Sequence, residues 1–266
     1  MFDGDGRAPG IIAAIGAVLL GLLYMELAGA PARLLLTNAA ALGIGLALLF
    51  LARALAPAAA WLRGPLLIGF SVILLATAFG GVAVEGASRW LSIGGLSVQP
   101  GLIFAPLIVT AYASRPEGWS AAALATAIFA IALQPDRAVA AMLLCGVAAI
   151  AVRRFDRGTL ALCVGAAVGL AWTLLRPDEL LATAYVDQIL YTSFEVHPVA
   201  ALAVWIGICL LFVPLFTQLR RRPGPAVCAL GALWGSAVVA AALGNYPTPL
   251  VGYGSSAIIG YLPAPI

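Results

Sequence analysis

The sequence contains no lysine and only one histidine, and charged residues make up 9% of its 266 positions. The formal net charge of +3 is too small to indicate a nucleic-acid partner. The cysteines form no CxxC pair and no Cys/His spacing, so no zinc-binding pattern is present. These absences exclude nucleic-acid-binding proteins and common metal-binding domains as interpretations.

Hydrophobic residues, by contrast, make up 63% of the chain. This composition is far from that of a soluble domain and indicates a polytopic membrane protein. The opening residues MFDGDGR carry acids, and the first apolar run is followed by many others. We therefore expect no cleavable signal peptide.

Apolar runs of about 15 to 20 residues recur along the chain, near the length at which a helix crosses a hydrocarbon core of about 30 Å. We predict an all-α polytopic membrane bundle formed by one domain over residues 1–266. About nine transmembrane helices are expected, at 11–30, 34–54, 65–84, 100–114, 118–134, 138–152, 158–175, 198–218 and 225–243. The Pro- and Gly-rich tail after residue 243 is expected to form a broken or re-entrant segment inside the bundle.

Small residues within these spans indicate close packing. The glycine pairs of GAAVG (165–169) and GALWG (231–235) let helices approach closely, and packing within the chain is favoured over dimerisation. The cysteines are expected to behave as small apolar residues rather than disulfide partners: Cys145, Cys163, Cys209 and Cys228.

Arginine placement predicts the orientation, since basic residues near span ends are retained in the cytoplasm. With a cytoplasmic N-terminus, only Arg33, Arg89, Arg137 and Arg176 fall outside. The others are then cytoplasmic: Arg7, Arg53, Arg63, Arg115, Arg153, Arg154, Arg157, Arg220, Arg221 and Arg222. Four polar segments share the outer face in this topology: GASRWLSIGGLSVQP (86–100), QPDR (134–137), RPDELLATAYVDQ (176–188) and GNYPTPLVGYGSS (244–256).

Each polar segment admits a structural and a functional interpretation. Arg89 can lie at the headgroups of an interfacial loop, or its planar guanidinium can bind phosphate oxygens. Asp136 can simply cap the next helix, and Asp187 can begin an amphipathic surface helix. His197 is expected to be interfacial rather than catalytic, and Asp178 and Glu179 are expected to be solvated loop acids.

In their order along the chain, these motifs resemble the SEDS family, the RodA/FtsW-like proteins of bacterial cell shape and division. The matching segments are GASRW (86–90), Gln99-Pro100, Gln134-Pro135-Asp136, DQILYTSFE (187–195) and TPLVGYGSS (248–256). The fourth of these keeps the family's spacing from aspartate to glutamate.

The resemblance implies a glycosyltransferase that polymerises lipid II, a disaccharide-pentapeptide on undecaprenyl pyrophosphate, at the outer face of the bacterial cytoplasmic membrane. A class B penicillin-binding protein would be its partner. Asp187 would be the catalytic base, with Asp136 as its main competitor, and a divalent cation such as Mg or Mn held by an acidic pair could bridge phosphate oxygens. The implied substrate-binding residues are Arg89, Gln99, Asp136, Arg137, Glu195, Tyr253, Ser255 and Ser256.

The chain departs from the family pattern in ways that leave a second interpretation open. Where the family continues QPSE with a lysine nearby, this chain has Gln99-Pro100-Gly101-Leu102, without the acid or the base. It therefore resembles a short, divergent member, and a noncatalytic membrane scaffold or assembly subunit of an envelope complex is the alternative. The segment LVGYG (250–254) also resembles a potassium-channel filter, but only twelve residues follow Gly254, too few for the following helix that would line the pore.

Overall fold

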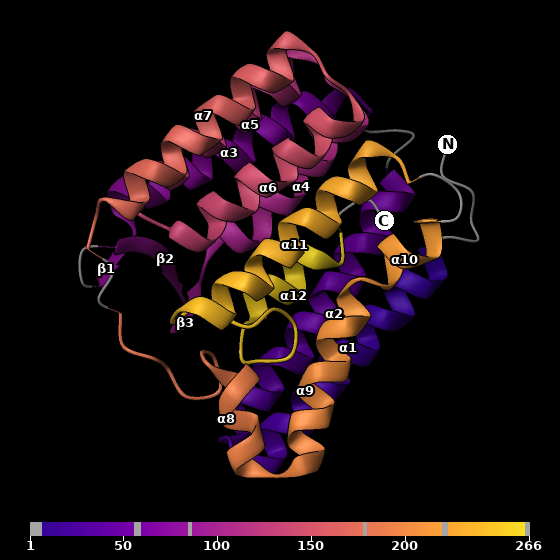
Figure 1. Cartoon of the computed structure of the whole chain (residues 1–266), viewed down its shortest axis with the longest axis vertical. Coiled ribbons are helices and arrows are strands. Elements are labelled where there is room, and N and C mark those ends of the chain that lie inside the picture. The colour runs from indigo at the N-terminus through magenta and orange to yellow at the C-terminus, as the bar shows by residue number, and fades with distance from the viewer. Residues whose placement is uncertain (1–6, 56–59, 85–86, 178–179, 220–222, 264–266) are drawn as a thin grey trace.

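The computed structural model describes residues 7–55, 60–84, 87–177, 180–219 and 223–263, and these residues form a helical bundle (Figure 1). Asp178, Glu179 and the arginines at 220–222 lie outside the described residues. The helices described are α1 (Arg7–Leu27), α2 (Ala32–Leu55), the short 3₁₀ helix η2 (Ala60–Leu62), α3 (Arg63–Gly80), α4 (Pro100–Ser114), α5 (Gly118–Leu133), α6 (Arg137–Arg153), α7 (Arg157–Leu174), α8 (Ile189–Val196), α9 (Pro198–Leu211), α10 (Val213–Leu219), α11 (Pro225–Leu243) and α12 (Ser255–Tyr261).

The predicted all-α membrane bundle is confirmed. Each of the nine predicted intervals overlaps a helix among the described residues. By length and hydropathy, α1, α2, α3, α7 and α11 are able to cross a membrane, and α4, α5 and α9 are apolar but shorter. Many of their large side chains are exposed, among them Leu36, Phe79, Phe129 and Val168, as expected for helices that face lipid.

Two predicted spans differ from the observed helices. The span predicted over 198–218 is divided at Phe212 into α9 and α10. Pro214 lies in the first turn of α10, and a proline cannot donate the backbone hydrogen bond that would continue α9. The span predicted over 65–84 ends early, at Gly80, where the chain turns into a strand.

The segment interpreted from the sequence as an interfacial loop is a small antiparallel sheet in the order β1-β2-β3. Its strands are β1 (Val82–Val84), β2 (Ala87–Ile93) and β3 (Leu96–Val98). Gly94 and Gly95 connect β2 to β3 with φ of 58° and 79°, a conformation that glycine adopts without strain and that tight hairpins require. The period-two alternation of β2 directs Ala87 and Arg89 inward, away from solvent.

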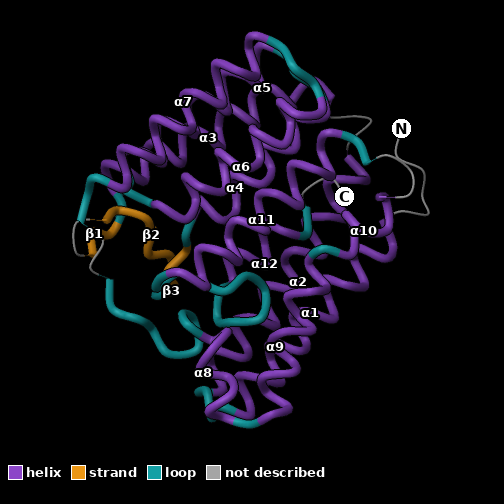
Figure 2. The backbone as a smooth tube through the Cα atoms, viewed as in Figure 1, coloured by secondary structure: helices purple, strands orange, loops and turns teal. Residues whose placement is uncertain are grey.

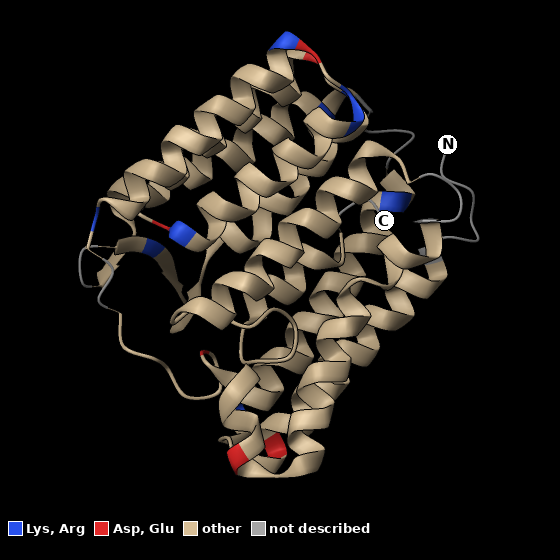
Figure 3. Cartoon of the chain, in the orientation of Figure 1, with Lys and Arg blue, Asp and Glu red and all other residues tan. Residues whose placement is uncertain are grey.

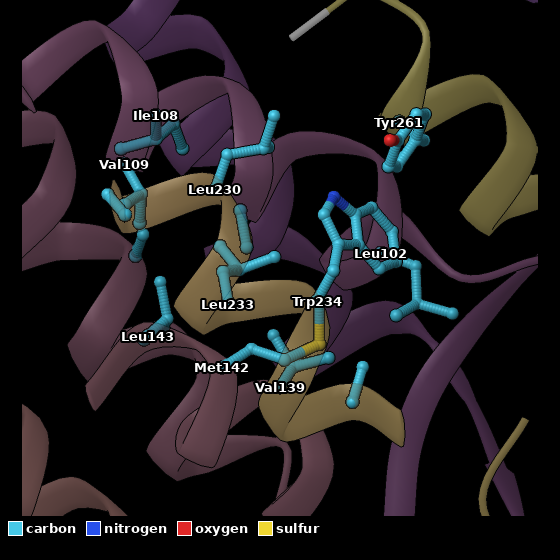
Figure 4. Packing of buried hydrophobic residues seen from close by; sticks show 14 of the residues in the cluster. Leu102, Ile108, Val109, Val139, Met142, Leu143, Leu230, Leu233, Trp234 and Tyr261 are labelled. Carbon is cyan, nitrogen blue, oxygen red and sulfur yellow. The ribbon is translucent and has the colours of Figure 1, made fainter. Parts of the chain in front are cut away.

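Figure 4 shows the part of the main hydrophobic core where α4, α6, α11 and α12 meet, and α1 and α5 also contribute buried residues to this core. Trp234 of α11 contacts Tyr261 of α12 with ring centroids 5.5 Å apart, and the Tyr261 hydroxyl donates to Leu211 O at 2.8 Å. A Cβ built on Gly260 would lie 2.0 Å from Leu102 O, so α12 and α4 touch backbone to backbone. The C-terminal segment is therefore broken and packed inside the bundle, as predicted.

The sheet, α8 and the loop that leads to α8 gather at one end of the bundle (Figure 2). Charged residues lie at the ends of the helices and in connections, and the long helices carry almost none along their middle (Figure 3). This distribution is the one that a hydrocarbon layer around the middle of the bundle would demand. We call the end that carries the sheet the sheet end.

Candidate functional site

Arg89 is held at the sheet end by the inward face of β2. Its side chain is only 2% exposed, and Nη2 donates to Pro135 O at 2.6 Å. The guanidinium carbon lies 5.9 Å from the ring centroids of Trp90 and Tyr246, within the range of cation–π attraction. Arg89 is thus a fixed cation that ties the GASRW strand to the turn before α6.

Gln99 connects three of the sequence motifs. Its Nε2 donates to Asp136 Oδ2 at 2.8 Å, and its backbone N–H donates to Ser256 Oγ at 2.9 Å. The other Asp136 oxygen, Oδ1, accepts from Val139 N at 3.1 Å, which makes Asp136 the N-cap of α6. Both oxygens of this buried carboxylate are occupied, so Asp136 positions Gln99 and caps a helix.

Asp187 lies in the loop that precedes α8, one residue before the N-cap Gln188. Its Oδ2 accepts from Thr183 N at 2.8 Å, so the carboxylate closes the loop rather than capping the helix. Oδ1 is buried and has no hydrogen-bond partner among the described residues. Burial raises the pKa of the Asp187 carboxyl, and the Thr183 N–H opposes part of this rise.

The loop and the tail are joined by backbone hydrogen bonds. Tyr253 N donates to Tyr185 O at 2.6 Å, and Thr248 N donates to Val186 O at 3.1 Å. Asn245 adds a side-chain link: its Nδ2 donates to Leu180 O at 2.8 Å and its Oδ1 accepts from Gln188 Nε2 at 2.7 Å. These bonds hold Asp187 over the segment between α11 and α12.

A cavity of about 380 Å³ opens between the sheet, the Asp187 loop and the tail. Six of the residues singled out in the sequence line it: Arg89, Gln99, Asp187, Tyr253, Ser255 and Ser256. Arg89 and Ser256, which are 167 positions apart in the chain, therefore line the same cavity. The cavity combines one buried cation and one buried carboxylate with hydroxyl groups and apolar side chains.

Three other predicted residues lie outside this cavity. Asp136 lies behind Gln99, as described above. Arg137 directs its guanidinium to backbone carbonyls at the end of α7, those of Thr173 (3.3 Å) and Arg176. Glu195 is exposed on α8.

The lone histidine is a helix cap. His197 precedes α9, is exposed, and accepts from Val199 N at 3.1 Å through Nδ1. It does not line the cavity.

Asn245, Tyr246 and Thr183 also line the cavity and were not predicted as site residues from the sequence. Asn245 and Tyr246 directly follow α11 in the run GNYP, and a polar pair between a span and a proline is a weak signal for them. Nothing in the sequence marks Thr183, because its contribution is a backbone N–H.

Within the described cavity lining, one carboxylate is present that could bind a divalent cation. Asp187 is the acidic side chain among the lining residues, and no group of three or more His, Cys, Asp or Glu side chains occurs in the described part of the chain. Magnesium is commonly bound by one or two carboxylates together with substrate phosphates. Among the described lining residues, Asp187 would hold such an ion together with substrate phosphates, and the acidic pair expected from the sequence is not found among these residues.

No protein-family model matches the sequence, and no curated protein matches it. The structure, however, is similar to the crystal structure of the rod shape determining protein RodA of Thermus thermophilus. The TM-score is 0.69 at 25% identity, over 96% of this chain and 92% of that chain. A crystal structure of a point mutant of the same RodA gives 0.68 and 24%, over 96% of this chain and 93% of that one.

A third similar chain belongs to a peptidoglycan synthase complex, in a structure concerned with the coordination of polymerization and crosslinking. Its TM-score is 0.61 at 22% identity, over 96% of this chain and 94% of that chain. These similarities extend over nearly the whole chain. This multi-pass membrane chain has a RodA-like SEDS fold.

Proposed function

We propose that the chain is a peptidoglycan glycosyltransferase that polymerises lipid II at the outer face of the bacterial cytoplasmic membrane, with its N-terminus in the cytoplasm. The observation that carries the proposal is the placement of Asp187 and Arg89 around one cavity. The RodA-like fold supports it, because the same segments resemble SEDS motifs in order and spacing.

The chemistry requires a base and a counter-charge. When the sugar hydroxyl of the acceptor attacks C1 of the donor sugar, a new C–O bond forms and the bond from C1 to the pyrophosphate oxygen breaks. The hydroxyl proton passes to Asp187, whose Oδ1 has no hydrogen-bond partner in the described structure. The leaving pyrophosphate keeps the electron pair and gains negative charge, which the buried guanidinium of Arg89 would stabilise.

The polar lining of the cavity would orient the substrate. Gln99 is fixed by Asp136, and Ser255 and Ser256 begin α12 beside it. Tyr253 offers a hydroxyl and a ring on the tail side. A class B penicillin-binding protein is the proposed partner, which the similarity to a chain of a peptidoglycan synthase complex supports.

A specific observation favours a second candidate, a noncatalytic scaffold of an envelope complex. Leu102 lines the cavity near the position at which SEDS proteins carry an acid, and no lysine exists in the sequence to replace the missing base. The cavity is therefore less cationic than that of a family member that carries the lysine. Under this interpretation the chain would bind its partner and leave lipid II unchanged.

The test is glycan-chain formation from purified lipid II by the purified protein in detergent or nanodiscs, with and without the penicillin-binding partner. An active RodA-type protein serves as the positive control. Chains of several disaccharides on a gel would support the glycosyltransferase. Partner binding without chain formation, under conditions in which the control polymerises, would establish the scaffold instead.

A further inference from the structure

Asn38 is an amide buried inside the apolar helix α2, with 1% of its surface exposed. Its side chain reaches the tail more than two hundred positions away: Nδ2 donates to Gly252 O at 2.9 Å, and Oδ1 accepts from Gly254 N at 3.3 Å. Nδ2 also lies 3.6 Å from Met25 Sδ of α1. Among the described contacts, this amide links α1, α2 and the tail.

The tail needs such a partner. Residues 244–254 are not helical, and residues 248–252 of this segment are buried inside the bundle. Non-helical backbone at membrane depth is tolerated only where protein groups or a wet cavity satisfy its N–H and C=O groups. One amide side chain can supply both a donor and an acceptor, and Asn38 uses both on the same turn of the tail.

The two bonds flank a cavity residue. Gly252 and Gly254 lie on either side of Tyr253, whose own N–H is bonded to Tyr185 O in the Asp187 loop. The tail also packs closely against α1 at Val251, since a Cβ built on Gly21 would lie 2.7 Å from backbone atoms of Val251. Tyr253 is thus fixed between α2 on one side and the Asp187 loop on the other.

We infer that Asn38 is a positioning residue, which clamps residues 252–254 so that Tyr253 and Ser255 form the tail side of the cavity. The clamp stands on geometry alone. Its consequence for turnover rests on the proposed glycosyltransferase function, and Asn38 itself does not line the cavity.

The clamp can be measured without catalysis. Ser255→Cys is introduced into a protein whose four cysteines are replaced by alanine, and labelling of the introduced thiol by a membrane-impermeant maleimide is followed in nanodiscs. Asn38→Leu keeps the size of the side chain and removes both hydrogen bonds. It should raise the labelling rate of that thiol about threefold or more, because the turn opens locally.

Thr110→Val is the matched control. Thr110 is equally buried in α4, but its hydroxyl bonds only within its own helix, to Pro106 O at 2.6 Å and Leu107 O at 3.2 Å. Its labelling rate should equal that of the parent. If Asn38→Leu does not fold, the labelling rate is measured in Asn38→Ser instead, because the serine side chain is too short to reach Gly252 O and Gly254 N. An unchanged rate in the folded Asn38 variant would overturn the inference.

Turnover gives a second readout. If the wild type polymerises lipid II, Asn38→Leu should lower kcat/KM about tenfold, mainly through KM, because the binding wall is displaced and Asp187 is not. Equal KM values in the variant and the wild type would contradict the positioning role. Absence of turnover in the wild type would count against the proposed function, and the labelling rates would still decide the role of Asn38.

Discussion

At the scale of single residues, the structure distinguishes the two carboxylates that the sequence offered as candidates for the base. Asp136 and Asp187 were both candidates for the base, but Asp136 has both oxygens bonded, whereas Asp187 keeps one oxygen without a partner among the described residues. Glu195 follows Asp187 at the family spacing and is nevertheless exposed, because α8 intervenes and turns it away. Spacing along a chain cannot report which carboxylate is buried against a cavity.

The raised pKa of Asp187 has a consequence for pH dependence. A base works in its ionised form, and burial raises the pKa of this carboxyl, so activity should fall as pH drops through a value above the usual aspartate range. The measurement is kcat/KM for lipid II polymerisation across the acid-to-neutral pH range. An acid limb at or below the pKa of an ordinary aspartate would contradict the burial that the structure describes.

Arg89 makes a prediction about affinity. Arg89→Lys keeps the charge but loses the planar fork that donates to Pro135 O, and a lysine cannot bind phosphate in the same two-pronged way. KM for lipid II should rise about tenfold, equivalent to about 1.4 kcal/mol of binding free energy. Arg176→Lys is the control, since Arg176 stacks on Trp172 outside the cavity, and it should leave KM unchanged.

At the scale of elements, the spans predicted from hydropathy overlap the observed helices, but some of their predicted ends are wrong. Apolar runs report burial in lipid, so they do not show where Pro214 divides α9 from α10. The sequence contains a signal for the hairpin of β2 and β3, namely Gly94-Gly95 between alternating polar and apolar residues. The segment was nevertheless interpreted as a polar interfacial loop. The tail was predicted to be broken because its glycines and prolines prevent a continuous helix.

The packing of α12 against α4 yields a stability prediction. Gly260→Ala would place a Cβ against the backbone of Leu102, where neither helix can yield by a side-chain rotation, and should destabilise the fold by about 1 to 3 kcal/mol. Gly165→Ala is the control, because apart from its chain neighbours and the backbone of its own helix no atom lies within 4 Å of the added Cβ. Thermal unfolding in detergent compares them. Equal midpoints would show that α12 does not pack as described.

The surroundings of the glycines in GAAVG (165–169) and GALWG (231–235) show how these two glycine pairs pack. Gly231 and Gly235 pack against Leu215 and Phe212, and Gly169 packs against α5, whereas Gly165 faces open space. Three of these four glycines therefore serve contacts within the chain, which agrees with the interpretation favoured from the sequence.

At the scale of the whole molecule, orientation remains a prediction from arginine placement, and labelling can test it. Ser92 is exposed at the sheet end, and Phe155 is exposed between α6 and α7 at the opposite end. In the cysteine-free protein in intact cells, Ser92→Cys should react with an impermeant maleimide added outside, and Phe155→Cys should react only after lysis. The reverse pattern would place the cavity in the cytoplasm and remove its access to the outer face.

The candidate site itself is a property of the whole fold. Its side chains come from β2, the start of α4, the Asp187 loop and the tail, and hydrogen bonds among these segments bring them around one cavity. The sequence motifs predicted which segments matter. Their meeting point depends on how the helices pack, which no local pattern specifies.

The glycosyltransferase proposal depends above all on Asp187, and Asp187→Asn tests it. The substitution keeps the size of the side chain and the bond from Thr183 N but removes the proton acceptor, so lipid II polymerisation should fall about 10²-fold or more while the unfolding midpoint is preserved. Glu26→Gln, the same change at an exposed acid of α1, should leave polymerisation as in the wild type. Polymerisation by the Asp187→Asn protein at the wild-type rate would contradict a catalytic role for this cavity.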